Sequence, residues 1–129
     1  MKKVISIIIV IVVILVIVYK LSILYIYTKV INNFPERFNL IKYKKGIKEE
    51  EVIVSKEDDI YEKLFEWVTK HKIGWGYNYI SYAQICDSNK YVSENIKIDV
   101  SKTYIIISLK VKGNIWVPIN RDCDIDLVE

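Results

Sequence analysis

Hydrophobic residues are concentrated in one stretch at the start of the chain. Val4–Val18 contains Ser6 as its only polar residue, and beyond Tyr19-Lys20 the apolar character continues to Tyr27. A helix over these 24 residues would be about 36 Å long, and the hydrocarbon core of a bilayer is about 30 Å thick. A lone strand in lipid would leave its backbone polar groups unsatisfied. The pattern therefore predicts one transmembrane helix over about residues 4–27.

Two other interpretations of this stretch are less favourable than an anchor. A secretory signal peptide also begins with lysines and an apolar run, but no small-x-small cleavage pattern follows, and the run is longer than usual. A helix buried in a soluble domain would need more surrounding chain than the remaining residues, about 100, can provide. We therefore expect an uncleaved membrane anchor over residues 1–33.

Charges on the two sides of the anchor give conflicting indications of its orientation. Lys2 and Lys3 precede the apolar stretch, whereas more basic residues follow it closely, and this larger number favours a cytoplasmic C-terminal side. A short tail with two lysines is, in contrast, typical of a retained signal-anchor. We expect a single-pass protein of the cell inner or plasma membrane, with its C-terminal domain outside the cytoplasm.

One amphipathic helix is the clearest pattern after the anchor. Ile60, Leu64 and Val68 recur at four-residue spacing, which predicts an apolar helix face. Ser55 is placed to accept a hydrogen bond from a backbone N–H of the first turn, with Asp58 at the reciprocal position of a capping box. The pattern predicts a helix over about Lys56–Lys72.

The residues after this helix have the composition of strands. They are rich in aromatic and β-branched residues and alternate between apolar and polar, with a Gly113-Asn114 hairpin turn and Pro118 at an edge. We predict an α+β fold in which one amphipathic helix packs on an antiparallel β-meander of about four strands. This domain is expected over residues 51–129, after a juxtamembrane linker over residues 34–50. The expected strands are Tyr77–Ile85, Tyr91–Val100, Thr103–Lys112 and Ile115–Val117.

The net charge of +3 for the whole chain does not describe the domain. Four of the 19 basic residues belong to the anchor and its flank, which leaves 15 basic against 16 acidic residues over residues 30–129. A near-neutral domain lacks the basic footprint of nucleic-acid binding, so we expect no nucleic-acid partner. Lys42–Lys48 is a local basic cluster that fits either anionic lipid headgroups or a solvated turn beside Glu49–Glu51.

Cys86 and Cys123 are the two cysteines and the candidates for one disulfide. In an oxidising compartment the bridge would close a loop of about 37 residues and stabilise the fold by about 3–4 kcal/mol in the chain-entropy model. In a reducing compartment they would be two thiols. The sequence leaves both states open.

The sequence shows no pattern typical of a catalytic or metal site. His71 lies between lysines in the last turn of the expected helix, where it complements the helix dipole. Asp122, Asp124 and Asp126 alternate as in the first half of a calcium loop, but Leu127 stands where that loop requires glycine. We expect no enzyme, no metal, no cofactor and no small-molecule substrate.

Aromatic residues are dense between the predicted helix and the sheet. Gly74-Trp75-Gly76 fits either a packed corner over the helix end or a recognition loop, and the corner is favoured. Tyrosine and tryptophan are enriched at the residues that dominate protein–protein binding. If the domain binds a partner, the expected surface comprises Trp75, Tyr77, Tyr79, Tyr82 and Trp116.

This region also resembles a known sequence pattern. Trp67–Trp75 reads W-x(6)-G-W, and Ile80–Ala83 matches V/I-[ST]-Y-A. Both are similar to motifs of small uncharacterised bacterial membrane-anchored proteins and lipoproteins, which usually carry a proline where this chain has Gln84. Some domains of this kind are associated with immunity (antitoxin) roles against secreted toxins. The resemblance implies, as an expectation, an immunity-protein role.

The sequence therefore favours a membrane-anchored, non-catalytic binding module that engages a protein partner. The alternative is a structural or accessory subunit of a membrane complex, in which the transmembrane helix makes the specific contacts. Ser6 and Ser22 are the only small residues of that helix, which argues against tight helix–helix packing.

Overall fold

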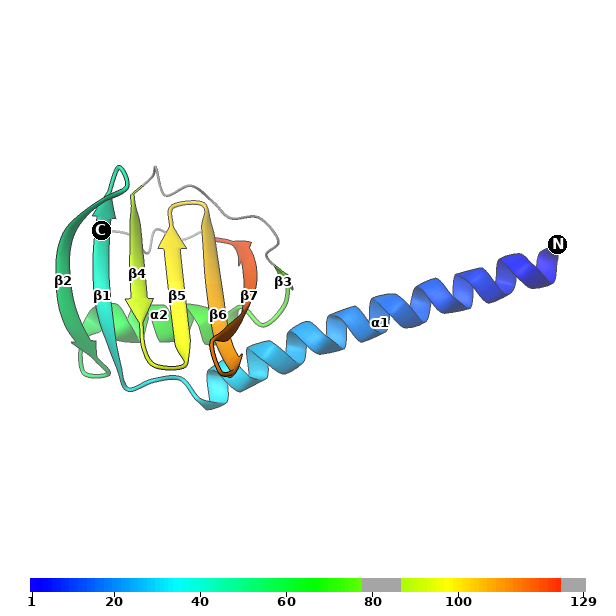
Figure 1. Ribbon diagram of the computed structural model, residues 1–129, viewed down its shortest axis with the longest axis horizontal. Coiled ribbons are helices and arrows are strands. Elements are labelled where there is room, and N and C mark those ends of the chain that lie inside the picture. Colours follow the sequence, from blue (N-terminus) through cyan, green and yellow to red (C-terminus); the bar gives the residue numbers. More distant parts are fainter. Residues whose placement is uncertain (78–86, 124–129) are drawn as a thin grey trace.

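The computed structural model describes residues 1–77 and 87–123, and its order of elements is helix, hairpin, helix, then a run of strands (Figure 1). The fold is α+β, as predicted, and all its strands belong to one antiparallel sheet. The elements are α1 (Lys2–Asn32), β1 (Arg37–Lys44), β2 (Ile47–Ser55), α2 (Asp59–Lys70), β3 (Gly76–Tyr77), β4 (Ser88–Val92), β5 (Ile96–Ser101), β6 (Tyr104–Lys112) and β7 (Ile115–Asp122).

Over the described residues the sheet has seven strands in the order β2-β1-β4-β5-β6-β7-β3, so the prediction of about four strands was too low. β4 to β7 form a four-stranded antiparallel meander, of which only β6 and β7 match predicted strands one to one. The predicted strand Tyr91–Val100 is divided between β4 and β5 by a turn, where the Ser93 hydroxyl donates to the Ile96 carbonyl at 2.8 Å. Of the predicted strand Tyr77–Ile85, only Tyr77 lies within the described residues, as the end of β3.

Residues 34–50, which the sequence assigns to a linker, contribute β1 and the start of β2 to the sheet. Phe38 and Leu40 alternate with polar neighbours in β1 and are both 1% exposed. β2 is the edge strand, and most of its side chains face solvent. Its charged residues are consistent with an exposed edge, and they conceal the period of two by which a strand is recognised.

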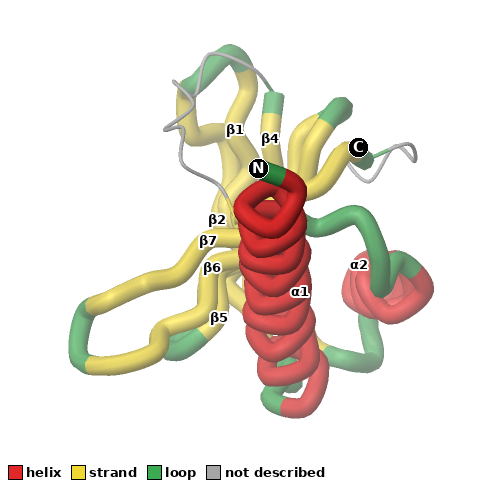
Figure 2. The backbone as a smooth tube through the Cα atoms, turned by 90° about the vertical axis from the view of Figure 1, so that its right-hand side faces the viewer, coloured by secondary structure: helices red, strands yellow, loops and turns green. Residues whose placement is uncertain are grey.

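α1 is long and apolar enough to span a membrane, but it also belongs to the folded domain. It continues to Asn32, and four side chains at helical spacing on its last turns are buried in the core: Ile23, Ile26, Tyr27 and Val30. Figure 2 shows the C-terminal part of α1 and the whole of α2 on the same face of the sheet. The last turns of this candidate membrane span are therefore part of the folded core.

α2 is shorter than predicted because its first turn begins after Asp58. Ser55 ends β2, and its backbone N–H donates to the Asp58 carboxylate at 2.8 Å, while its hydroxyl donates to Glu57. These bonds close a turn between strand and helix. The predicted reciprocal bond to Asp58 is present, but the Ser55 hydroxyl donates instead of accepting from the first turn, and the N-cap residue is Asp58. The buried face of α2 was predicted correctly at Leu64 and Val68, which are at most 1% exposed.

Candidate functional site

The predicted aromatic surface is not one surface, because its described members point in different directions. Trp75 is only 3% exposed, and its indole N–H donates to the carbonyl of His71 at 2.6 Å. Its ring packs among Tyr27 and Trp67, with centroids 6.1 and 6.4 Å away. Trp75 thus forms the packed corner that closes the end of α2, the interpretation that the sequence favoured, and it presents no ring to a partner.

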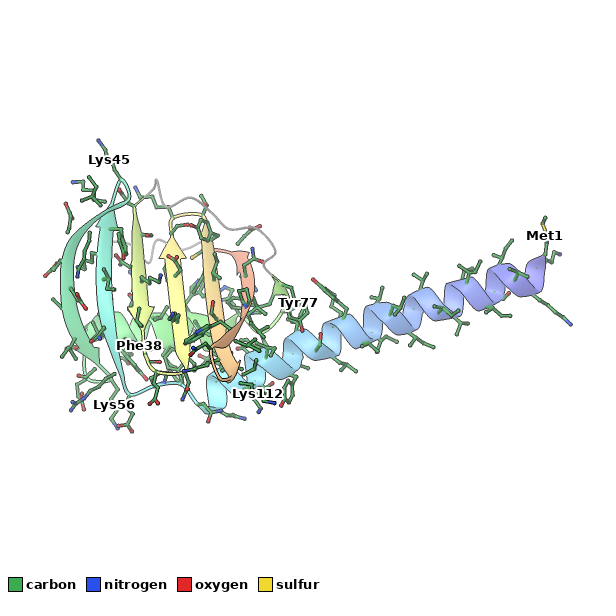
Figure 3. The ribbon with its side chains drawn as sticks, in the orientation of Figure 1. Met1, Phe38, Lys45, Lys56, Tyr77 and Lys112 are labelled. Atoms are coloured by element: carbon green, nitrogen blue, oxygen red, sulfur yellow. The ribbon has the colours of Figure 1, made fainter. Side chains whose placement is uncertain are left out.

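Tyr77 faces α1. Its hydroxyl donates to the Ser22 hydroxyl at 2.8 Å, and its ring meets that of Tyr19 edge-on with the centroids 5.5 Å apart. The Tyr77 backbone N–H also donates to the Tyr19 hydroxyl at 3.4 Å. Figure 3 shows Tyr77 at the margin of the domain that lies beside α1. Its contacts attach the edge of the sheet to the helix.

Trp116 lies on the other face of the sheet. In β5, Ile96, Ile98 and Val100 point into the core, so the intervening Lys97 faces the opposite side. The ammonium of Lys97 lies 4.3 Å from the centroid of the Trp116 ring. We call this side, which neither helix covers, the open face; its residues in β5–β7 include Lys97, Asp99, Ile106, Ser108, Lys110, Trp116 and Pro118.

Two lysine side chains of the open face lie close to the Trp116 ring. Lys110 is the register partner of Trp116 in β6, and its ammonium lies 5.9 Å from the same ring. Trp116 is half-buried, and both ammonium groups lie close to its ring. A lysine ammonium near an aromatic face is attracted by the ring quadrupole, so both cations are held near the indole. The cluster is complementary to carboxylates.

Pro118, predicted to mark an edge, lies next to an open position of the sheet. β3 pairs with β7 only at Ile119 and Asn120, so the outer edge of β7 has no strand partner at Pro118 among the described residues. The Gly113-Asn114 turn joins β6 and β7 as expected. These two features leave the strand segment that carries Trp116 at the border of the sheet.

Three predicted residues, Tyr79, Tyr82 and Cys86, lie outside the described residues. Cys123 is buried, at 6% exposure. Because Cys86 lies outside the described residues, the pairing of the two cysteines stays a prediction. The basic cluster near Lys45 forms the β1–β2 turn, and Figure 3 shows Lys45 and Met1 at opposite ends of the molecule. This places the cluster far from the segment that would enter a bilayer.

The environment of His71 is structural. Its ring stacks on Trp67 with the centroids 4.0 Å apart, and Nδ1 donates to the Trp67 carbonyl at 2.7 Å. Over residues 1–77 and 87–123, no group of three or more His, Cys, Asp or Glu side chains is arranged to hold a metal ion.

Comparisons of the chain with protein-family models, with curated proteins and with solved structures found no match.

Proposed function

We propose that this chain is a membrane-anchored, non-catalytic binding module whose open face engages a protein partner around Trp116. The Trp116 cluster is the observation that supports this proposal. It combines a half-buried tryptophan with two held ammonium groups on the sheet face that neither helix covers. Tryptophan with surrounding polar groups is the composition of a binding hot spot.

The chemistry of the cluster favours a partner that presents carboxylates. Lys97 and Lys110 offer hydrogen-bond donors beside the indole, and the ring itself offers apolar area. The narrower role of an immunity protein, with a toxin as the partner, rests on the resemblance to small anchored bacterial proteins.

Substitution of Trp116 tests the proposal. The full chain is solubilised together with its native membrane and cross-linked to the proteins bound to it. The affinity of each captured partner is then measured for the native protein, Trp116→Ala and Ile115→Ala. Ile115 is a suitable control because it lies next to Trp116 and is 60% exposed. We expect Trp116→Ala to weaken binding at least thirtyfold, the effect of losing a hot spot worth about 2 kcal/mol. An equal effect of the two substitutions contradicts the proposed surface.

An accessory subunit that binds through the span remains the alternative, because the side chains of Val4–Val18 are all exposed in the chain alone. Exchanging Val4–Val18 for an unrelated apolar sequence of equal length separates the two functions. The exchange must stop before Tyr19, where contacts with the domain begin. A binding module retains its partner after this exchange, and an accessory subunit loses it.

A further inference from the structure

The free part of α1 is shorter than a bilayer is thick. Contacts with the domain begin at Tyr19, so only Val4–Val18 is apolar and unattached, and its length is about 22 Å. A hydrocarbon core of about 30 Å exceeds this length. α1 is one unbroken helix, and its buried turns hold it against the sheet. The domain therefore reaches the membrane surface wherever α1 spans a bilayer.

The turn between α2 and β3 lies beside α1 just after the free segment, opposite Lys20, Ile23 and Leu24. Ile73 is at the tip of this turn and is 84% exposed. Across from it, on α1, lie Lys20 and Leu24, and between the two elements is a notch of about 200 Å³. The notch is lined by Lys20, Ile23, Leu24, Lys72, Ile73, Gly74 and Trp75.

Hydrogen bonds fix the backbone of this turn, so the fold itself holds the Ile73 side chain in an exposed position. The Arg121 guanidinium donates to the Ile73 carbonyl from β7, and the Trp75 indole donates to the His71 carbonyl. Gly74 has a φ of +97°, a conformation that L side chains rarely adopt. The backbone is thus held from both sides while the isoleucine side chain points away from the core.

The lining of the notch combines cations with apolar side chains. Lys20 and Lys72 both line it, and within the described part of the chain no acidic residue does and neither lysine forms a salt bridge. Lysines next to exposed apolar residues are the composition of a surface that sits at the headgroup level of a bilayer.

We propose that the notch binds an anionic phospholipid of the membrane that α1 spans, with its phosphate between Lys20 and Lys72 and Ile73 among its acyl chains. We favour a lipid as the occupant because the notch is continuous with the free apolar segment: its first lining residue lies two positions after Val18. The proposal rests on insertion of α1 and is independent of the Trp116 surface.

Lipid titration of the full chain in detergent, followed by native mass spectrometry, tests the phosphate contact. The probes are phosphatidylglycerol and phosphatidylcholine, and the variants are Lys20→Gln/Lys72→Gln and, as a control with the same charge change, Lys44→Gln/Lys45→Gln. We expect the first pair to weaken phosphatidylglycerol binding about thirtyfold, since each lysine near a membrane surface contributes a factor of about five. Equal affinities of the two double variants, or equal binding of the two lipids by the native chain, overturn the proposal.

The acyl contact is tested in lipid nanodiscs of the same two lipids mixed, which leave the domain accessible whichever side it occupies. Ile73→Cys and Ile53→Cys are compared, because Ile53 is 72% exposed and lies on β2 at the far edge of the sheet. The rate of modification by a water-soluble maleimide is measured at each site by peptide mapping, which separates the new cysteine from the native ones. We expect modification at position 73 to be at least tenfold slower. Equal rates overturn the proposal, even if the lysine variants behave as expected.

Discussion

The smallest fragment that folds should begin within α1. Four side chains of α1 are buried in the core, with Val30 fully buried and the others at most 6% exposed. Burying one such side chain contributes about 1.5–3 kcal/mol, so the four together contribute about 6–12 kcal/mol, an upper estimate because unfolded chains already bury some area. A small domain has a total stability of about 5–15 kcal/mol. We expect residues 19–129 to fold and residues 33–129 to remain unfolded.

Urea unfolding followed by circular dichroism measures this difference directly on the two fragments. A matched pair of substitutions in residues 19–129 gives the same information at one position. Val30→Ala should cost about 2 kcal/mol, because it removes buried methyl groups and leaves a cavity. Thr28→Ala, at an exposed position of the same helix, should change the stability by less than about 0.5 kcal/mol. Cooperative unfolding of residues 33–129, with a stability within about 2 kcal/mol of the longer fragment, would refute this reasoning.

Two further predictions concern the domain itself. Burial raises the pKa of Tyr61, with a smaller contribution from the Glu36 carboxylate, and the Tyr61 hydroxyl donates to the Pro35 carbonyl at 2.5 Å. The fold thus favours the neutral phenol, and this contribution to the free energy of unfolding is complete below about pH 10 and lost as the pH rises further. Tyr61→Phe should cost about 1 kcal/mol of stability at pH 7. In urea unfolding, the same substitution should reduce the loss of stability at alkaline pH. An alanine in the left-handed conformation costs about 1–2 kcal/mol of stability. Gly74→Ala should cost more than this, because the added Cβ would lie 3.1 Å from Arg121 Nη1. Gly113→Ala, which has open space around the added Cβ, should cost only the conformational amount in the same assay.

The parts of the fold that the sequence predicts are those with one dominant period. The apolar face of α2 and the alternation in β5 and β6 are examples, because each of these elements has one buried and one solvated side. The β1–β2 hairpin was missed because β2 is an exposed edge strand with Glu49–Glu51 in sequence, which resembles a charged linker.

The division of α1 into two environments could not be read from its composition. Lipid and protein core both favour apolar side chains, so Ile23 and Val30 give the same signal as the residues before Tyr19. The one indication in the sequence came from polar side chains. The hydroxyl groups of Ser22 and Tyr27 are unfavourable in lipid without a hydrogen-bond partner, and in the structure both have partners in the domain. Likewise, aromatic density predicted a surface, but only tertiary packing distinguishes a core tryptophan such as Trp75 from a half-buried one on the open face such as Trp116.

The attachment of α1 also fixes the direction of the open face. Figure 1 views the sheet face-on while α1 lies in the plane of the picture, and the strands run across the direction of the helix. If α1 crosses a bilayer along its axis, the β3 edge lies next to the membrane and the β2 edge farthest from it, so the open face looks along the membrane surface. Tyr77 and the buried turns of α1 prevent the domain from turning about a flexible joint. The proposed surface around Trp116 is therefore oriented toward a partner that lies beside the domain at the same membrane.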